Sequence, residues 1–259
     1  SGPEMQDELT FEELTEFMDQ LKAMGAFEVT ISGGEPFYHP RIWDLLAYAR
    51  RHFSVTVLTN GLLIDDEACE RLRELGIKEI YVSLDGASPQ TNDAIRGNGT
   101  FRRATAAVRR MVAHGLPVYL NVVVTRQNKH ELDAMVELAK QLGVGRIAMQ
   151  EAIDQGRAAD SDVLLGPEEV AEFKKWLFKR RLTETEILVG ELDEYAAPAA
   201  LSQNGREYPD LCPAIRGSLA LLPNGDTVPC TLMERPELVT GNIRKQSLFD
   251  IWNHSPLHQ

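Results

Sequence analysis

The sequence is poor in the features that mark several protein classes. Its 259 residues contain three cysteines, Cys69, Cys212 and Cys230, which are too few and too scattered for a disulfide framework. No apolar run approaches the roughly 20 residues of a membrane-spanning helix, and no signal-peptide pattern is visible. Lys and Arg number 27 against 39 Asp and Glu, a net charge of −12, so a basic stripe for nucleic-acid phosphates is lacking. We therefore expect a cytoplasmic protein that binds neither membrane nor nucleic acid.

What is present is an ordinary globular composition with alternating helix and strand patterns. Apolar residues make up 43% and charged residues 25%, which suits a soluble chain with a buried core. The first predicted element is a helix, since Thr10 and Glu13 form a capping box and apolar residues at helical spacing run to Gly25. Five strands are then predicted to start near residues 27, 54, 78, 117 and 144, with helices between them. The spacing is that of βα units.

This alternation is compatible with an open doubly wound sheet and with a partial TIM-like barrel. In both, ligands bind at the carboxyl ends of the strands. Because a capped helix precedes the first visible strand, we expect that the series lacks its natural first strand. The pattern changes near residue 160, where a helix over 167–181 and an irregular stretch follow. We therefore predict two domains, residues 1–160 and 161–259. The second contains a hairpin in which strands 219–222 and 226–228 flank a Pro-Asn-Gly turn.

The strand ends carry the candidate site residues. The first strand is followed by Gly33, Gly34, Glu35 and Pro36, and a glycine pair allows backbone to approach a ligand closely. A plain βα turn explains the same residues equally well.

Polar side chains follow the next strands. Asn60 follows the second strand, and Ser83 and Asp85 share one face at the end of the third, where they could hold a ribose or an amino-acid head group. Alternatively, these two cap the next helix. Arg96 lies in a predicted glycine-rich loop, from which it could bind a carboxylate in bidentate fashion or simply be solvated.

Taken together, these segments resemble the radical S-adenosylmethionine superfamily. Residues 32–36 (SGGEP) look like its GGEP motif, and residues 59–61 (TNG), 83–86 (SLDG) and 95–97 (IRG) are similar to its following segments in order and spacing. The resemblance implies that the GGEP backbone binds the amino group of S-adenosylmethionine. It also implies that Ser83 and Arg96 contact the ribose or carboxylate, and that Asn121 and Met149 lie near the ribose and adenine. The implied fold is α/β, a partial (β/α)6 TIM-like barrel over residues 5–160.

The C-terminal cysteines extend the resemblance. Cys212 and Cys230 form a C-x12-G-x4-C pattern around the predicted hairpin, which is similar to the start of a SPASM or twitch domain. The resemblance implies that these two thiolates ligate an auxiliary iron–sulfur cluster. Taken alone, two cysteines at this spacing are weak evidence, because buried free cysteine is common. Cys69 is predicted to lie in the core of a helix.

The sequence also departs from the family pattern. The superfamily holds its catalytic 4Fe–4S cluster with a CxxxCxxC motif, which these 259 residues do not contain, and further SPASM cysteines are missing after Trp252. We interpret this as a chain whose cluster-binding ends were cut off or not represented, in preference to divergence into a cluster-free pseudoenzyme. We therefore expect the chain as given to be inactive.

The complete protein is expected to cleave S-adenosylmethionine to a 5′-deoxyadenosyl radical, with electrons from a reductant such as flavodoxin or ferredoxin. Its predicted substrate is a ribosomally made peptide or protein. The alternatives are a haem-like tetrapyrrole substrate in cofactor biosynthesis, a non-catalytic homologue that binds peptide or S-adenosylmethionine, and an unrelated metabolic barrel with eight closed strands.

Overall fold

The computed structural model describes residues 7–154, 158, 162–190 and 217–255. The chain forms two compact units, one built from Phe27–Leu192 and the other from Gly2–Ala26 together with Asp193–Gln259. The N-terminal helix therefore belongs to the same unit as the C-terminal segment. The sequence-based domain division near residue 160 stays a prediction.

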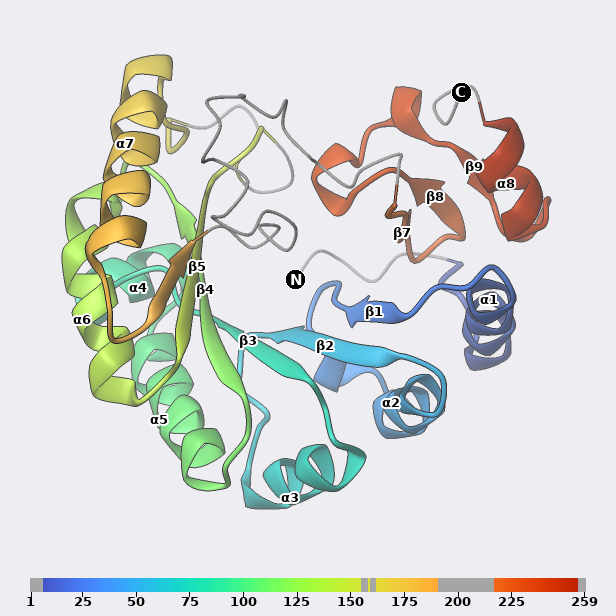
Figure 1. Ribbon diagram of the computed structural model, residues 1–259, viewed down its shortest axis with the longest axis horizontal. Coiled ribbons are helices and arrows are strands. Elements are labelled where there is room, and N and C mark those ends of the chain that lie inside the picture. The colour runs from blue at the N-terminus through green and yellow to red at the C-terminus, as the bar shows by residue number, and fades with distance from the viewer. Residues whose placement is uncertain (1–6, 155–157, 159–161, 191–216, 256–259) are drawn as a thin grey trace. The chain divides into compact units, whose positions relative to one another are not determined.

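A six-stranded parallel sheet forms the first unit, with its strands in the order in which they occur in the chain. The strands are β1 (Glu28–Ile31), β2 (Ser54–Thr59), β3 (Glu79–Ser83), β4 (Val118–Val124), β5 (Arg146–Glu151) and β6 (Leu188–Gly190). The helices are α2 (Ile42–Arg50), α3 (Asp66–Leu75), α4 (Pro89–Arg96), α5 (Thr100–Ala113), α6 (Leu132–Leu142) and α7 (Pro167–Thr183). Right-handed crossovers in sequential order place the helices on one face of such a sheet, and Figure 1 shows them on the outer side of a curved sheet. This is the architecture of a partial TIM-like barrel.

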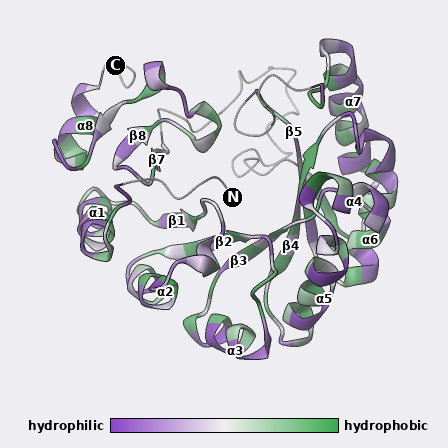
Figure 2. Ribbon diagram, turned by 180° about the vertical axis from the view of Figure 1, so that it is seen from behind, coloured by the Kyte–Doolittle hydropathy of each residue, from purple (hydrophilic) through white to green (hydrophobic). Residues whose placement is uncertain are grey.

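The helix-facing side of the sheet forms the core of this unit. Val57, Val82, Leu120 and Ile147 lie on it and are completely buried. Figure 2 shows mainly hydrophobic residues in the central strands, whereas the surrounding helices contain both hydrophobic and hydrophilic residues. Strands of this kind are typical of parallel sheets that are covered by crossover helices.

Two elements of the first unit differ from the sequence-based expectation. β6 lies in a stretch that was expected to be irregular, because three residues are too few to show a strand period. α4 ends at Arg96, which was expected to lie in a loop, since Gly97 follows with a φ of 103°. A backbone at this φ suits glycine and ends the helix there.

The second unit combines a helix with a small antiparallel sheet. Its elements are α1 (Phe11–Ala23), β7 (Ala220–Leu221), β8 (Asp226–Val228), β9 (Gly241–Asn242) and α8 (Leu248–His254). β8 pairs with β7 on one side and with β9 on the other. The hairpin around the Pro-Asn-Gly turn is as predicted, and Gly225 provides the positive φ of 88° that this turn needs.

Hydrogen bonds and an ion pair hold α1 to the C-terminal segment of this unit. The backbone N–H of Leu248 donates to Oε1 of Gln20 at 2.7 Å, and the guanidinium of Arg244 binds the Glu13 carboxylate. The hydrogen bond from Arg244 is the main reason why the pKa of Glu13 is lowered to about 2, and the backbone N–H of Thr10 adds to it. The second unit thus depends on residues from both ends of the sequence.

Candidate functional site

The predicted binding residues of the first unit lie at or near the carboxyl edge of the sheet, where parallel strands all end. Gly33 and Gly34 follow β1, and both are exposed. Gly33 has a φ of 132°, which suits glycine, and an added Cβ would meet no atom within 4 Å. The backbone at the end of β1 is therefore open on the side where a ligand could approach.

The carboxylate of Glu35 holds this loop to the end of β2. It is 8% exposed and accepts hydrogen bonds from Oγ1 of Thr59 at 2.7 Å, from the backbone N–H of Asn60 at 2.6 Å and from that of Phe37 at 3.3 Å. Pro36 beside it is buried and begins a short 3-10 turn. Since the carboxylate is fully used inside the protein, Glu35 shapes the loop instead of offering a free charge.

Asn60, at the end of β2, also has a local partner. Its side-chain Oδ1 accepts a hydrogen bond from the backbone N–H of Leu62 at 2.8 Å, which closes an Asx-type turn. The residue is half-buried. Its contribution to the edge is therefore a fixed turn beside the Gly33 loop.

Ser83, the last residue of β3, lies beside Asn121, which is within β4. They are register partners in neighbouring parallel strands, so their side chains share one face. Asn121 is 7% exposed, and its Oδ1 has no hydrogen-bond partner. The Ser83 hydroxyl is half-buried and makes no hydrogen bond within the described residues. A buried acceptor without a partner costs free energy, and ligand hydrogen bonds are one way to satisfy it.

Asp85 is used to order the edge of the sheet. It is 3% exposed; its Oδ1 accepts from the backbone N–H of Val123 at 2.8 Å, and its Oδ2 lies 2.7 Å from Nε of Arg96. Neither Ser83 nor Asp85 caps α4, because Ser88 does so. Arg96 is thus held by an ion pair at Nε, although this nitrogen makes no hydrogen bond of good geometry, and its terminal nitrogens make no hydrogen bond among the described residues. They remain available to an anionic group.

A buried polar network supports this arrangement. Nδ2 of Asn128 donates to the backbone oxygens of Asp85 and Val123, each at 2.8 Å, and Oδ1 of Asn92 accepts from the backbone N–H of Asp85 at 3.0 Å. Gly86 allows the close approach of α4, because a Cβ there would lie 2.4 Å from the backbone nitrogen of Asn92. The end of β3 is therefore held rigidly from three sides.

The side chain of Met149 lies on the face of the sheet opposite to that of Asn121. Its register partner is Val122, and both residues lie on the helix-facing side, where Met149 is completely buried. The side chains of β5 that share a face with Asn121 are those of Arg146, of Ala148, which is the register partner of Asn121, and of Gln150. The sequence analysis missed Gln150, although the alternation of apolar Ile147 and Met149 with their neighbours signals it.

The predicted metal ligands are covered only in part. Cys212 lies outside the described residues. Cys230 follows β8, is half-buried, and its Sγ accepts from the backbone N–H of Leu232 at 3.5 Å. Cys69 lies in the core as predicted, and burial raises the pKa of its thiol to about 11. No group of three or more His, Cys, Asp or Glu residues that could hold a metal ion occurs within the described ranges.

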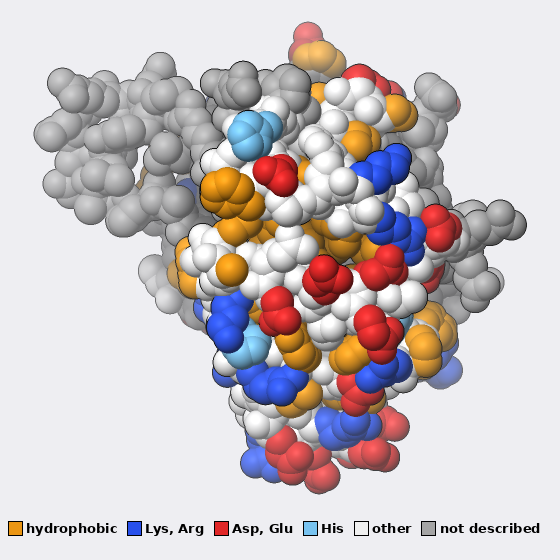
Figure 3. Space-filling model, turned by 90° about the vertical axis from the view of Figure 1, so that its right-hand side faces the viewer, with side chains coloured by type: hydrophobic (Ala, Val, Ile, Leu, Met, Phe, Trp, Pro, Cys, Tyr) orange, Lys and Arg blue, Asp and Glu red, His pale blue; other side chains and the backbone are white. Residues whose placement is uncertain are grey.

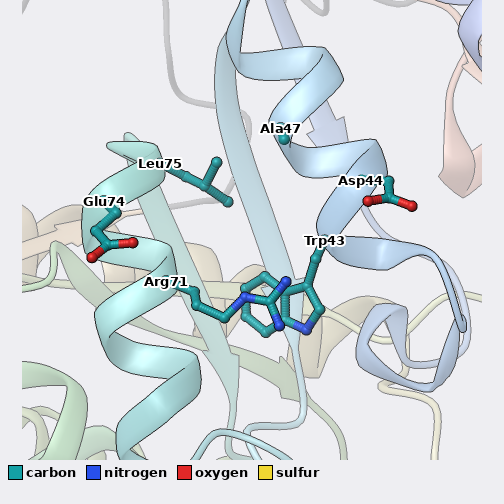
Figure 4. A pocket seen from close by; sticks show the side chains of 6 residues that line it. All are labelled: Trp43, Asp44, Ala47, Arg71, Glu74 and Leu75. Carbon is teal, nitrogen blue, oxygen red and sulfur yellow. The ribbon is translucent and has the colours of Figure 1, made fainter.

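Two other features of the described residues were compared with this site. A hollow of about 270 Å³ lies between α2 and α3, where the guanidinium of Arg71 sits 4.1 Å from the ring centroid of Trp43 (Figure 4). In Figure 3, acidic and basic side chains are interspersed among the described residues of the face shown. Within the described part of the chain, helices of the length and hydropathy needed to cross a bilayer are absent.

Sequence comparisons agree with the geometry. The model of the Radical SAM superfamily matches residues 1–139, and that of the SPASM iron–sulfur cluster-binding domain matches residues 212–259. The mycofactocin maturase MftC of Mycobacterium tuberculosis H37Rv is 31% identical over 99% of this chain and 66% of its own length. The PqqA peptide cyclase of Gluconobacter oxydans is 30% identical over 94% and 67%. The chain thus spans about two thirds of these relatives.

Solved structures share the fold at low sequence identity. Streptococcus suis SuiB bound to its precursor peptide SuiA matches with a TM-score of 0.78 at 19% identity, over 99% of this chain and 61% of SuiB. Native anSMEcpe with bound AdoMet matches with a TM-score of 0.77 at 15% identity, over 99% and 75%. The family match covers more than half of the chain, and it agrees with the parallel sheet. The chain is a member of the radical SAM superfamily, a family of enzymes, and it carries a SPASM domain.

Proposed function

We propose that the carboxyl edge of the first unit binds S-adenosylmethionine. The observation that carries this proposal is Oδ1 of Asn121, an acceptor that is buried at this edge without a partner. A ribose hydroxyl can donate to it, and the neighbouring Ser83 hydroxyl can join the same hydrogen-bond pattern. The donor set therefore fits the nucleoside part of the molecule.

The methionine part fits the residues on either side. The exposed backbone carbonyls around Gly33 and Gly34 can accept from an ammonium group, and the terminal nitrogens of Arg96 can bind a carboxylate. Asp85 keeps the Arg96 side chain in place by its contact at Nε. When bound, S-adenosylmethionine supplies the 5′-deoxyadenosyl group for radical chemistry. The residues described hold and orient it.

The cysteines that could ligate iron–sulfur clusters lie outside this binding edge. Cys212 and Cys230 are our candidates for thiolate ligands of an auxiliary cluster in the SPASM region. The described residues do not by themselves make a cluster site, and the 259 residues contain no CxxxCxxC motif. We accordingly expect these residues alone to bind S-adenosylmethionine without releasing 5′-deoxyadenosine. Formation of that product by this chain would contradict the expectation.

The binding site can be tested with two glycine variants, one at the proposed site and one away from it. Gly33 and Gly115 both have a positive φ, of 132° and 71°, and an added Cβ meets no atom within 4 Å at either position. Gly115 follows α5 and precedes the amino end of β4, away from the proposed site. Gly33→Ala should weaken the binding of S-adenosylmethionine at least about tenfold in equilibrium dialysis, because it disturbs the backbone that receives the ammonium group. Gly115→Ala should leave the affinity unchanged. Absence of binding by the unaltered chain, or equal effects of both variants, would refute the proposed site.

For the complete protein we infer a ribosomally made peptide or protein as substrate. This inference is supported by the relatives, which include mycofactocin maturases, PqqA peptide cyclases and a subtilosin biosynthesis protein. It is further supported by the fold shared with SuiB bound to a precursor peptide. We propose a low-potential flavodoxin or ferredoxin as reductant and the cytoplasm as the location.

A second candidate substrate is a haem-like tetrapyrrole. The AdoMet-dependent heme synthase of Methanosarcina barkeri is 26% identical over 96% of this chain. The two candidates separate in one experiment with the full-length protein, reconstituted without oxygen with iron and sulfide and then reduced. The peptide proposal expects 5′-deoxyadenosine release to rise when a small peptide encoded next to the gene is added, together with a mass change of that peptide. A response to a tetrapyrrole precursor alone would overturn the peptide assignment in favour of the second candidate.

A further inference from the structure

Two large apolar side chains of α7 lie on the protein surface. Phe178 and Leu182 are 65% and 67% exposed, although Phe173 and Leu177 of the same helix are buried. Phe178 and Leu182 are four residues apart, so they are neighbours on one face of the helix. Exposed apolar side chains that gather with a rim of polar groups mark interaction sites, whereas single ones need no explanation.

This apolar pair points away from the other helices of the first unit. Trp176 and Arg180 face α6, where they donate hydrogen bonds to carboxylates at 3.2 and 3.1 Å. Phe178 and Leu182 follow these two residues by two positions each, which on an α-helix is a rotation of about 200°. The pair therefore lies on the flank of α7 opposite to α6. In the described part of this unit, α7 is the last helix of the series (Figure 1).

Lysines border the apolar pair. Lys175 precedes Phe178 by three residues and Lys179 precedes Leu182 by three, a spacing at which helix side chains are neighbours. Both lysines are exposed and make no ion pair within the described ranges. Residues 173–183 contain five basic and no acidic side chains, although the whole chain has a net charge of −12. We call these four residues the α7 stripe: Lys175, Phe178, Lys179 and Leu182.

We propose that the α7 stripe binds an acidic, apolar segment of the peptide substrate. Apolar side chains of that segment cover Phe178 and Leu182, and its carboxylates pair with Lys175 and Lys179. The assignment rests on the proposed function, in which a peptide or protein is the substrate. It adds a surface that recognises this substrate.

The α7 stripe lies at the opposite end of the helix layer from the carboxyl edge of the sheet. Phe178 and Leu182 belong to the last turns of α7, which ends at Thr183, and the chain then enters β6 at Leu188. A crossover helix returns the chain to the amino edge of a parallel sheet, so its last turns lie beside the amino ends of the strands. The segment bound here is therefore a part of the peptide other than the residue that reacts at the carboxyl edge.

Two other occupants fit the α7 stripe less well. A second copy placed on the same stripe by a twofold axis would bring the lysines of both copies together, and like charges oppose such a contact. A helix that lies in a membrane surface inserts its whole apolar face, whereas Phe173 and Leu177 of α7 are 3% and 5% exposed inside the protein. A segment with carboxylates satisfies both the apolar pair and the lysines.

The full-length protein, reconstituted as above, and the peptide encoded next to the gene test the proposal. Lys175→Glu combined with Lys179→Glu reverses both charges, and Phe178→Ser removes one apolar side chain. Each change should raise the dissociation constant of the peptide, measured by fluorescence anisotropy, at least about tenfold. The KM of the peptide in 5′-deoxyadenosine release should rise in parallel while kcat stays unchanged, because the α7 stripe does not touch the reacting groups. A peptide with Asn and Gln in place of Asp and Glu should bind the unaltered protein about tenfold more weakly.

Matched controls change the same charge or the same apolar group elsewhere. Arg102→Glu combined with Arg109→Glu gives the same change in net charge on α5, where both arginines are exposed. Phe249→Ser removes a phenylalanine of α8 that is 61% exposed. Both controls should leave the dissociation constant and the KM unchanged. Lys175→Gln combined with Lys179→Gln is a milder variant that should weaken binding in the same direction if the glutamate variant does not fold.

The outcomes separate the two levels of the proposal. If the unaltered protein does not respond to the peptide, the proposed peptide substrate fails and the role of the α7 stripe fails with it. If it responds while the α7 variants behave like their controls, the role of the stripe is overturned and the peptide substrate stands. A dimer in sedimentation that Phe178→Ser dissociates would overturn the proposal in favour of a second copy. Binding to phosphatidylcholine and phosphatidylserine vesicles that the charge reversal abolishes would overturn it in favour of a membrane.

Discussion

Replacing Asn121 by leucine separates a binding role from a structural one. Leucine has nearly the same size and shape as asparagine, but it carries no polar atoms. In the structure Asn121 is 7% exposed, and its Oδ1 lacks a partner. The substitution therefore removes an unsatisfied acceptor from the protein and, if the proposal holds, a ligand contact from the site.

The expected changes have opposite signs for stability and for binding. A buried polar group without a partner costs roughly 1–3 kcal/mol, so Asn121→Leu should raise the free energy of unfolding by about 1 kcal/mol. For a chain of this size that corresponds to a melting temperature about 2–4 °C higher. Loss of one ligand hydrogen bond should weaken the binding of S-adenosylmethionine about tenfold, which equals about 1.4 kcal/mol.

Urea unfolding and thermal melts with and without S-adenosylmethionine measure both effects. Asn128→Leu is the matched control, because Asn128 is also a buried asparagine, at 2% exposure. Its side chain accepts from the backbone N–H of Thr125 at 2.7 Å and donates to the backbone oxygens of Asp85 and Val123. This control should therefore lower the free energy of unfolding by about 3 kcal/mol or more.

Two results would refute the reasoning. If Asn121→Leu destabilises the ligand-free chain as much as Asn128→Leu does, Oδ1 of Asn121 has a structural partner. If the affinity for S-adenosylmethionine is unchanged, Asn121 does not contact the ligand.

Two further predictions concern the packing of α4 and the acid stability of the second unit. Gly86→Ala should lower the free energy of unfolding in urea by about 3 kcal/mol, because the new Cβ would meet the backbone nitrogen of Asn92 at 2.4 Å. Arg244→Gln should reduce the loss of stability on acidification. The hydrogen bond from Arg244 is the largest of the causes that lower the pKa of Glu13 from 4.5 to about 2. The stability that it contributes is complete above pH 4.5 and is lost as the pH falls toward 2. Acid titration followed by circular dichroism measures this window.

Each of these predictions has a control of the same residue type. Gly217→Ala adds a Cβ that meets no atom within 4 Å at an ordinary φ, so its stability should stay within about 0.5 kcal/mol. Arg235→Gln changes an exposed arginine and should leave the acid titration unchanged. Equal effects in a variant and its control would contradict the packing argument for Gly86 or the charge argument for Arg244.

The fold was largely predictable because its signals are local. The apolar run of β4 and the capping box of α1 lie within a few residues of sequence, and both elements form where they were expected. β6 was missed because its pairing with β5, from Arg146 to Leu188 onward, is a long-range contact. A stretch of three residues is too short to show the period of a strand.

The site was predictable as a set of segments but not as a set of contacts. The motifs located the ends of β1, β2 and β3. Only the structure shows that the carboxylates of Glu35 and Asp85 accept hydrogen bonds from the protein itself. Tertiary hydrogen bonds decide this, and they are invisible to motif spacing. Similarly, choosing between Met149 and Gln150 requires knowing which face of β5 is covered by helices.

The joining of α1 to the C-terminal segment has a consequence for the order of synthesis. Roughly 200 residues separate α1 from β7, and at about 5–20 residues per second their synthesis takes on the order of 10–40 seconds. During this time α1 lacks its contacts with Arg244 and Leu248, which bind Glu13 and Gln20. The first unit contains none of these partners, so it can fold on the ribosome before the second unit is assembled. The second unit can therefore form completely only after synthesis has passed α8.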